Sequence, residues 1–359
     1  MRHYSIALIP GDGIGVDVIR EGKKVLDTIC EIHGGISLQY ENFDWSCEYF
    51  AKHGKMMPDN GLDILKNFDS IYLGAVGYPG VPDHVSLWGL LLPIRRAFEQ
   101  YINIRPVKLL RGITSPLAGR GPDALDFIVI RENNEGEYSN IGGRMYEGTS
   151  LDMAIQNSVF TRTGVERVLR YAFQLAQEKG KRKRLTAATK SNGINHTMPF
   201  WDEYVQKIGL EYPDVKTDIV HIDALCAFFV SKPDVFDVVV ASNLFGDILT
   251  DLGAAIVGGL GIAPSANINP EKKYPSMFEP VHGSAPDIAG KGIANPIAAI
   301  WCASMILEHF GEYQSAHAIM EAIQSVLEEG LVLTPDLGGR ATTEEVGNHI
   351  CQKLKANEL

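Results

Sequence analysis

Two periods of apolar residues alternate along the first third of the chain. Residues 5–9 form a short apolar run that ends at the glycine-rich residues 10–15, and residues 16–29 carry apolar side chains at helical spacing. Residues 70–73 form a second short apolar run, again followed by a glycine-rich segment. Short apolar runs are typical of buried strands, and the 3.6-residue spacing is typical of helices that pack on them. This alternation predicts an α/β protein with a parallel sheet covered by helices.

The rest of the chain extends this pattern. Glycine-containing turns between residues 138 and 160 predict a projecting arm. Apolar spacing predicts a helix over residues 242–252 and two long helices over residues 297–310 and 316–329. Further strands are predicted at residues 127–130, 185–189, 218–221 and 236–241.

Composition and charge exclude several classes of partner. The chain has 359 residues, 45% hydrophobic and 21% charged, as in an ordinary globular protein with two domains or one large domain and a lobe. The net charge of −11 disfavours nucleic acid and anionic membrane surfaces as partners, and no apolar run is long enough to cross a membrane. Five cysteines without a Cys-x-x-Cys pair do not indicate a disulfide framework, so we expect a cytoplasmic protein.

Asp247 and Asp251 lie four positions apart in the helix predicted over residues 242–252. Residues at this spacing share one face of a helix, where two carboxylates repel each other. Either water or a cation must offset that repulsion. Hard divalent cations prefer oxygen ligands, so the pair is a candidate metal site, with a solvated acid pair as the alternative.

Three arginines are candidates for binding an acidic substrate. Arg95 lies in LLLPIRRAF, Arg105 in NIRP, and Arg131 directly follows the strand predicted at residues 127–130. A strand end in an α/β sheet opens onto the ligand crevice, and the guanidinium fork binds carboxylates with two hydrogen bonds. Together with two acidic residues, the arginines indicate a small di-acid held against a metal. Ion pairs within the fold are the alternative.

Tyr138 and Lys190 are a candidate acid and base. Lys190 follows the strand predicted at residues 185–189, and a lysine near a metal and another cation can have a depressed pKa and act as a base. Asp223 follows the strand predicted at residues 218–221, where it is either a third oxygen ligand or the N-cap of the next helix.

Two glycine-containing segments suggest ligand contacts. Residues 10–15, PGDGIG, do not match a Rossmann fingerprint, because Val16 stands where a glycine or alanine is needed. That segment is either a tight strand-to-helix turn or a backbone close to a ligand. Residues 278–296 combine glycine and alanine with His282, Asp287 and Asn295. A carboxylate there can accept hydrogen bonds from both ribose hydroxyls of NAD and would repel the extra phosphate of NADP.

In order along the chain, the strings IPGDGIG, NIRP, VIREN with EGEYS, TKSN, SNLFGDILTD and EPVHGSAPDIAGKGIANP resemble the decarboxylating β-hydroxyacid dehydrogenases. This family includes isocitrate, 3-isopropylmalate, tartrate and D-malate dehydrogenases, and the resemblance covers essentially the whole chain. It implies an α/β fold of the isopropylmalate/isocitrate dehydrogenase type, unlike a Rossmann fold. It also implies a discontinuous large cofactor-binding domain (1–100 and 256–359), a small dimerisation domain (101–255) and a clasp arm (about 138–160).

The resemblance further implies cofactors, an assembly and a role for each matched residue. It implies NAD, Mg²⁺ or Mn²⁺, a monovalent cation such as K⁺, and a homodimer whose active sites are shared. Lys190 matches the base and Tyr138 the proton donor, and Lys190, Asn192 and Asp223 would come from the second subunit. The matched substrate arginines are Arg95, Arg105 and Arg131; the metal ligands are Asp223, Asp247 and Asp251; and the cofactor residues are Asn192, Glu279, His282, Gly283, Ser284, Ala285, Asp287 and Asn295.

The segment before Arg95 indicates the substrate. Gly89 and Leu91 stand where isocitrate enzymes present serine and asparagine to a third carboxylate. Trp88 stands where isopropylmalate enzymes place a glutamate, and a bulky indole would narrow the pocket toward a four-carbon di-acid. The segment is similar to the family's tartrate and D-malate dehydrogenases, so we expect one of these activities. A 3-isopropylmalate dehydrogenase is the nearest alternative, and an inactive regulatory subunit is a remote one, because every catalytic position is intact.

Overall fold

The structure is a computed structural model that describes residues 1–356. Its described part contains one ten-stranded sheet, in the order β2-β1-β3-β12-β11-β4-β5-β10-β8-β9, and a separate two-stranded sheet, β6-β7. The strands are β1 (Arg2–Gly11), β2 (Ile36–Asn42), β3 (Ser70–Ala75), β4 (Ile102–Lys108), β5 (Asp126–Glu132), β6 (Gly142–Met145), β7 (Met153–Gln156), β8 (Arg184–Thr189), β9 (Lys216–His221), β10 (Val238–Ala241), β11 (Pro264–Ile268) and β12 (Ser276–Pro280).

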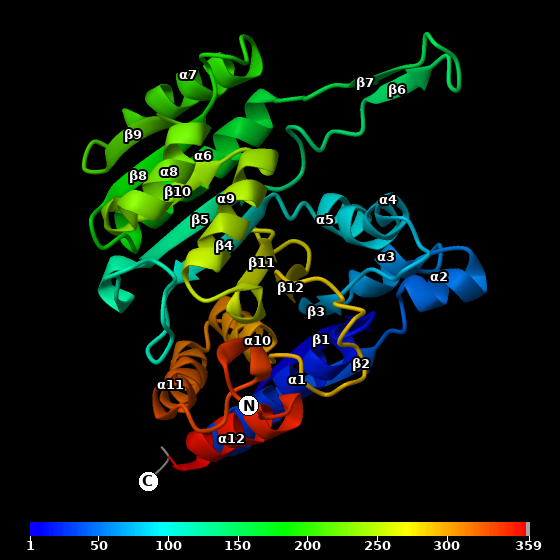
Figure 1. Ribbon diagram of the computed structural model, residues 1–359, viewed down its shortest axis with the longest axis vertical. Coiled ribbons are helices and arrows are strands. Elements are labelled where there is room, and N and C mark those ends of the chain that lie inside the picture. Colours follow the sequence, from blue (N-terminus) through cyan, green and yellow to red (C-terminus); the bar gives the residue numbers. More distant parts are fainter. Residues whose placement is uncertain (357–359) are drawn as a thin grey trace.

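Helices cover both ends of the large sheet. In Figure 1, α1, α10, α11 and α12 gather around the end of the sheet that holds β1–β3, and α6–α9 lie around the end that holds β5 and β8–β10. The α-helices are α1 (Gly15–His33), α2 (Cys47–His53), α3 (Gly61–Leu65), α4 (Asp83–Ser86), α5 (Leu92–Ala97), α6 (Arg162–Glu178), α7 (Thr197–Gly209), α8 (Ile222–Ser231), α9 (Asn243–Ile256), α10 (Ile297–Phe310), α11 (Tyr313–Glu329) and α12 (Thr343–Ala356).

The sheet is parallel at both ends but antiparallel in its centre. β11 pairs antiparallel with β12 and with β4, and β4 pairs antiparallel with β5. The seven residues between β11 and β12 are too few for the crossover that a parallel connection needs. The parallel sheet expected from the sequence is therefore wrong for the central strands, while the α/β class is confirmed.

The central strands join distant parts of the sequence. β12 pairs with β3, so strands from residues 1–100 and 256–359 are neighbours, and β11 pairs with β4 from residues 101–255. The division into two domains at these boundaries stays a prediction. Every strand and helix predicted from apolar patterns is present, and α10 has the predicted bounds.

The glycine-rich residues 10–15 form a tight turn against another loop. The Ile14 amide donates to the Ser284 carbonyl at 2.9 Å. A Cβ on Gly13, which has a φ of 57°, would lie 2.1 Å from that same oxygen. Asp12 is buried, and its carboxylate accepts hydrogen bonds from the Cys47 and Gly77 amides. The structure therefore supports the tight-turn alternative for this segment, which holds the loop that contains Ser284.

The arm projects away from the rest of the molecule (Figure 1). Its strands β6 and β7 are exposed along their whole length, and several of its apolar side chains face solvent, among them Ile141 and Leu151. All five cysteine thiols are free. No described helix is long and apolar enough to span a membrane.

Candidate active site

A cavity of about 230 Å³ opens where the central strands meet the helices. Its walls come from both halves of the sequence: α5 supplies Arg95, β4 supplies Arg105, β5 supplies Arg131 and α9 supplies Asp247. Its remaining polar lining includes Tyr138, Ser265, Glu279 and His282, and its apolar lining includes Leu73, Leu87, Leu91 and Leu92.

The three arginines predicted from the sequence line this one cavity, and all are buried. Arg95 Nη2 donates to Glu279 Oε1 at 2.7 Å, and Arg105 Nη1 donates to Thr250 Oγ1 at 2.6 Å. Burial lowers the pKa of Arg105, and burial together with the charge of Arg105 lowers the pKa of Arg131 to about 10. The Nε atoms of Arg95 and Arg105 are buried without a hydrogen-bond partner in the described chain. Such unmet donors suit an anionic ligand.

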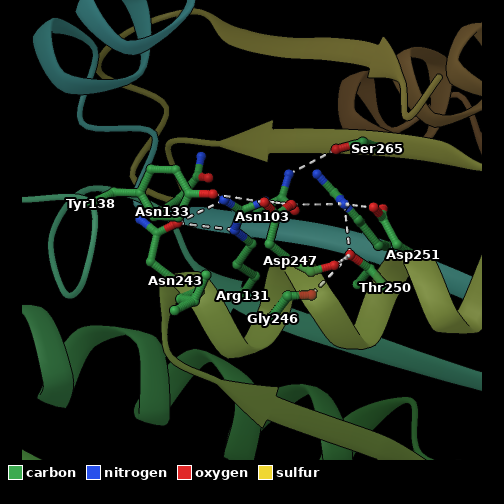
Figure 2. A network of polar contacts seen from close by, with 12 residues as sticks. Asn103, Arg131, Asn133, Tyr138, Asn243, Gly246, Asp247, Thr250, Asp251 and Ser265 are labelled. Carbon is green, nitrogen blue, oxygen red and sulfur yellow. Dashed lines mark hydrogen bonds and ion pairs between the residues drawn. The ribbon is translucent and has the colours of Figure 1, made fainter. Parts of the chain in front are cut away.

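Tyr138 and Asp247 form the second feature of the cavity. The Tyr138 hydroxyl donates to Asp247 Oδ2 at 2.9 Å, and Arg131 Nη1 donates to Asp247 Oδ1. Figure 2 shows Tyr138, Arg131 and Asp247 pointing toward one another above α9. Burial and the charge of Asp247 raise the pKa of Tyr138, so its phenol is protonated at neutral pH and can donate a proton.

Asp247 and Asp251 lie on one face of α9, as the sequence predicts (Figure 2). Arg105 Nη1 lies 3.5 Å from Asp247 and 3.7 Å from Asp251. Burial raises the pKa of Asp251. Within residues 1–356, no three histidine, cysteine, aspartate or glutamate side chains are placed so that they could hold a metal ion. The two carboxylates fit a divalent cation as part of a ligand set that needs at least one more donor.

Lys190, Asn192 and Asp223 lie outside this cavity. Lys190 follows β8, and its Nζ donates to Asp223 Oδ1 at 2.7 Å, which lowers the pKa of Asp223. Asp223 lies in the first turn of α8 rather than at its N-cap, which is His221, and its side chain is 67% exposed. Strands β10, β8 and β9 are parallel neighbours, so these residues extend from the same sheet edge as α9.

The segment before Arg95 differs from the sequence interpretation at one residue. Leu91 lines the cavity as predicted, and so do Leu87 and Leu92, but Trp88 is not part of the lining. Its ring lies 4.6 Å from the Arg96 guanidinium instead. The π-helical turn Leu87–Leu91 leads into α5, and its winding brings Leu87, Leu91 and Arg95 to the cavity. The contact of Trp88 with the substrate therefore stays a prediction.

The residues matched to the cofactor fall into two groups. Glu279, His282 and Gly283 line the cavity described above, and His282 Nε2 is buried without a partner in the described chain. Gly283, Ser284 and Ala285 also border an adjoining open cavity of about 590 Å³. Asp287 is exposed, and Asn295 Nδ2 donates to Asp336 Oδ2 at 2.9 Å. Because His282 Nδ1 lies 2.9 Å from the Gly283 carbonyl, Nε2 of the neutral ring is an acceptor. This unmet histidine acceptor and the open glycine-containing loop fit a bound nucleotide.

Several site residues were missed by the sequence analysis. Asn243 accepts two hydrogen bonds from Arg131, and Thr250 accepts one from Arg105. Their spacing from Asp247, four positions before and three after, puts them on its helix face, and that signal could have found them. Glu137 accepts a hydrogen bond from the Leu244 amide, and Asp336 accepts one from Asn295. Both contacts join residues far apart in the sequence, so the spacing of residues could not predict them.

Comparisons with known proteins show what this chain is similar to. Residues 5–350 match the family described as isocitrate/isopropylmalate dehydrogenase. The chain is 56% identical to the "Probable tartrate dehydrogenase/decarboxylase" of Bacillus subtilis over 99% of each chain. It is also 56% identical to the D-malate dehydrogenase (decarboxylating) of Escherichia coli, over 98% of this chain and 99% of that relative. The crystal structure of isocitrate dehydrogenase from Methylococcus capsulatus matches with a TM-score of 0.89 at 35% identity, over 98% of this chain and 99% of that one.

Proposed function

Because this chain belongs to the isocitrate/isopropylmalate dehydrogenase family, we propose that it oxidises a small 2-hydroxy di-acid with NAD and a divalent metal, with loss of CO₂. Two relatives with 56% identity are named for tartrate and D-malate, so these are the substrates we propose. One observation carries the proposal: three buried guanidinium groups and the Tyr138–Asp247 pair line a single small cavity.

The arginines bind and orient the di-acid. The three guanidinium groups can together bind two carboxylates of a substrate. Buried arginines also discriminate strongly between an anion and a neutral group. Asp247 and Asp251 would hold Mg²⁺ or Mn²⁺, with Asp223 of a second copy as the third ligand. Members of the family generally use NAD and a divalent metal. When bound, the cation polarises the substrate oxygen and NAD accepts the hydride.

Protons are moved by two side chains. Lys190 of a second copy takes the proton of the C2 hydroxyl as the C2 hydrogen leaves as hydride, which makes C2 a ketone. The carboxylate β to this ketone then leaves as CO₂, and the electron pair of the broken C3–C4 bond forms the C2–C3 double bond of an enolate. The Tyr138 hydroxyl donates a proton to C3, so D-malate gives pyruvate.

The positions of three residues support a site shared between two copies. Lys190, Asn192 and Asp223 are outside the cavity that holds Arg131 and Asp247, and family members are generally homodimers. We propose that the cavity is completed by these three residues of a second copy. The exposed carboxylate of Asp287 favours NAD over NADP, because it would repel the additional phosphate.

A second candidate, 3-isopropylmalate dehydrogenase, is favoured by one observation. Leu87, Leu91 and Leu92 give the cavity an apolar wall, which could contact an isopropyl group.

The test is NAD⁺ reduction with Mn²⁺ across D-malate, L-tartrate, meso-tartrate, 3-isopropylmalate and isocitrate. We expect best turnover on D-malate or a tartrate, and abolished turnover in Lys190→Met. Best turnover on 3-isopropylmalate would overturn the substrate proposal, and normal NADH formation by Lys190→Met would overturn the role of the base.

A further inference from the structure

Glu137 immediately precedes Tyr138 in the loop after β5, and its carboxylate lies at the N-terminus of α9. Ser242 Oγ donates to Glu137 Oε1 at 2.8 Å, and the Leu244 amide donates to Glu137 Oε2 at 3.1 Å. Glu137 is not part of the cavity lining. It therefore contacts the helix that carries Asp247 without facing the substrate.

This arrangement replaces the usual cap of a helix. The side chain of an N-cap serine normally accepts a hydrogen bond from the second or third helical amide. Ser242 is the N-cap of α9, but its side chain caps no amide and donates to Glu137 instead. The second helical amide, that of Leu244, is satisfied by Glu137. A carboxylate in this place is also favoured by the helix dipole.

Tyr138, the residue after Glu137, contacts α9 about one turn further along the helix. The Tyr138 hydroxyl donates to Asp247 Oδ2 at 2.9 Å, while Asn243 Nδ2 donates to the Glu135 carbonyl at 3.1 Å. From the other side, Arg96 Nη2 donates to the Tyr138 carbonyl at 3.0 Å. The loop is thus joined to the start of α9 at Asn243 and Leu244, ahead of the contact of Tyr138 with Asp247, and to α5 through Arg96. Glu137 supplies a charged group to the loop's contacts at the helix N-terminus.

We propose that Glu137 is a positioning residue that holds Tyr138 where it can protonate C3 of the substrate. The inference rests on the proposed function, in which Tyr138 is the proton donor. Without the Glu137 carboxylate, the loop and the start of α9 lose two hydrogen bonds, one from an amide and one from a hydroxyl. The tyrosine hydroxyl then samples a wider range of positions, which slows proton transfer more than it weakens binding.

The same loop offers a matched control. Glu135 lies two residues earlier, and its carboxylate accepts hydrogen bonds from the amide and the hydroxyl of Thr161, each at 2.8 Å. Thr161 is the N-cap of α6, a helix that carries none of the site residues. Glu135→Ala therefore removes a helix-terminal carboxylate from this loop without touching its contact with α9.

The experiment measures D-malate turnover to pyruvate with NAD⁺ and Mn²⁺. We expect Glu137→Ala to lower kcat about tenfold while both KM values change less than about twofold, and Glu135→Ala to leave kcat within about twofold. Glu137→Gln retains an acceptor for the Leu244 amide, so it recovers most of kcat. In a Tyr138→Phe background, where water supplies the proton, Glu137→Ala has no further effect, because residues that act through one group are not additive. Mn²⁺ affinity, measured by electron paramagnetic resonance, stays unchanged.

Two results would overturn the proposal: Glu137→Ala slowing the Tyr138→Phe enzyme by the full factor, or Mn²⁺ affinity falling in parallel with kcat. Either would mean that Glu137 acts on α9 as a whole. An unchanged kcat in Glu137→Ala would overturn it as well. If Glu137→Ala does not fold, Ser242→Ala, which removes one partner of the carboxylate, must give the same pattern. Absence of D-malate and tartrate oxidation by the unmutated protein would instead refute the proposed function, and this inference with it.

Discussion

Asp247 lies at the centre of several polar contacts of the cavity. Its carboxylate accepts hydrogen bonds from Arg131 and Tyr138, and Arg105 lies 3.5 Å away. Burial alone would raise its pKa, but the charges of Arg131 and Arg105 outweigh burial and hold the pKa of Asp247 below its usual range. The residue is therefore anionic at neutral pH, and its charge keeps the neighbouring phenol protonated. One carboxylate thus serves the proton donor and remains a candidate ligand for a cation.

Thr250 holds Arg105, one of the arginines proposed to bind the substrate. Its hydroxyl accepts from Arg105 and donates to the Gly246 carbonyl within α9. We predict that Thr250→Val, which is close in shape, leaves Arg105 without this acceptor and raises the KM for the di-acid about tenfold, with a smaller effect on kcat. Steady-state kinetics with Thr250→Ser as the control checks this. A di-acid KM that is unchanged in Thr250→Val would show that Arg105 is held by other contacts.

Glu132 makes stability depend on pH. Burial raises its pKa from 4.5 to about 7, although its two oxygens accept from the Asn134 and Glu135 amides. Because the folded-state pKa is raised, the stability contributed by the protonated form is fully present below pH 4.5 and is lost as pH rises through about 7. We predict that between about pH 5 and pH 8 the unmutated protein loses about 2 to 3 kcal/mol of unfolding free energy relative to Glu132→Gln.

Urea denaturation at the two pH values measures that difference, because the glutamine variant lacks the titrating group and supplies the reference at each pH. A gap between the two proteins that does not change with pH would mean that Glu132 titrates at its ordinary value in the folded state.

At the scale of elements, the sequence predicts the helices and strands whose buried side carries only apolar residues. α10 lies at the predicted residues, and β3, β8 and β9 contain the predicted runs. β4 and β11 carry no such run, because they bury polar side chains: Asn103 Nδ2 donates to Ser265 Oγ and to Asn267 Oδ1 across the two strands. A search for apolar runs passes over strands held together in this way.

The site, like the fold, is predictable only where its residues follow a local spacing in the sequence. The acid pair on α9 depends on helical spacing alone, so it could be inferred locally. The capping of α9 by Glu137 joins residues 107 positions apart, and the displacement of Trp88 from the cavity depends on a π-helical turn. Neither has a local signature, which is why the sequence analysis could not predict the Glu137 cap or the contact of Trp88 with Arg96.

The arm is an element whose apolar side chains lack a partner within the described chain. Ile141 is 52% exposed and Leu151 is 69% exposed. Exposed apolar patches of this kind mark interaction surfaces. We predict that Ile141→Glu with Leu151→Glu shifts the protein toward monomer, because burying two carboxylates in a subunit contact is costly. Sedimentation velocity measures this, with unchanged circular dichroism as the check on folding. A dimer equal in stability to the unmutated one would exclude the arm from the subunit contact.

At the scale of the whole molecule, the chemistry is divided between two places on one chain. The arginines, Tyr138 and two acids line the cavity, while Lys190 and Asp223 pair with each other outside it. The proposed base and the proposed third ligand both lie outside the cavity, at the same edge of the sheet. In a symmetric dimer, the sheet edge that carries Lys190 and Asp223 of each copy would lie at the cavity of the other copy and complete two sites. The residues of one site would then not need to meet within a single chain.

This division gives a test at the level of the assembly. Lys190→Met and Asp251→Asn each inactivate both sites of their own dimer, since every site would contain one altered residue. In a mixed dimer, one site receives both altered residues and the other receives neither. Random mixing makes half of the dimers mixed, so we predict recovery of about a quarter of the unmutated activity after the two inactive proteins are dissociated and reassembled together. Each variant reassembled alone is the control and stays inactive. If each site instead used residues of a single chain, every site in the mixture would carry one altered residue and no activity would return.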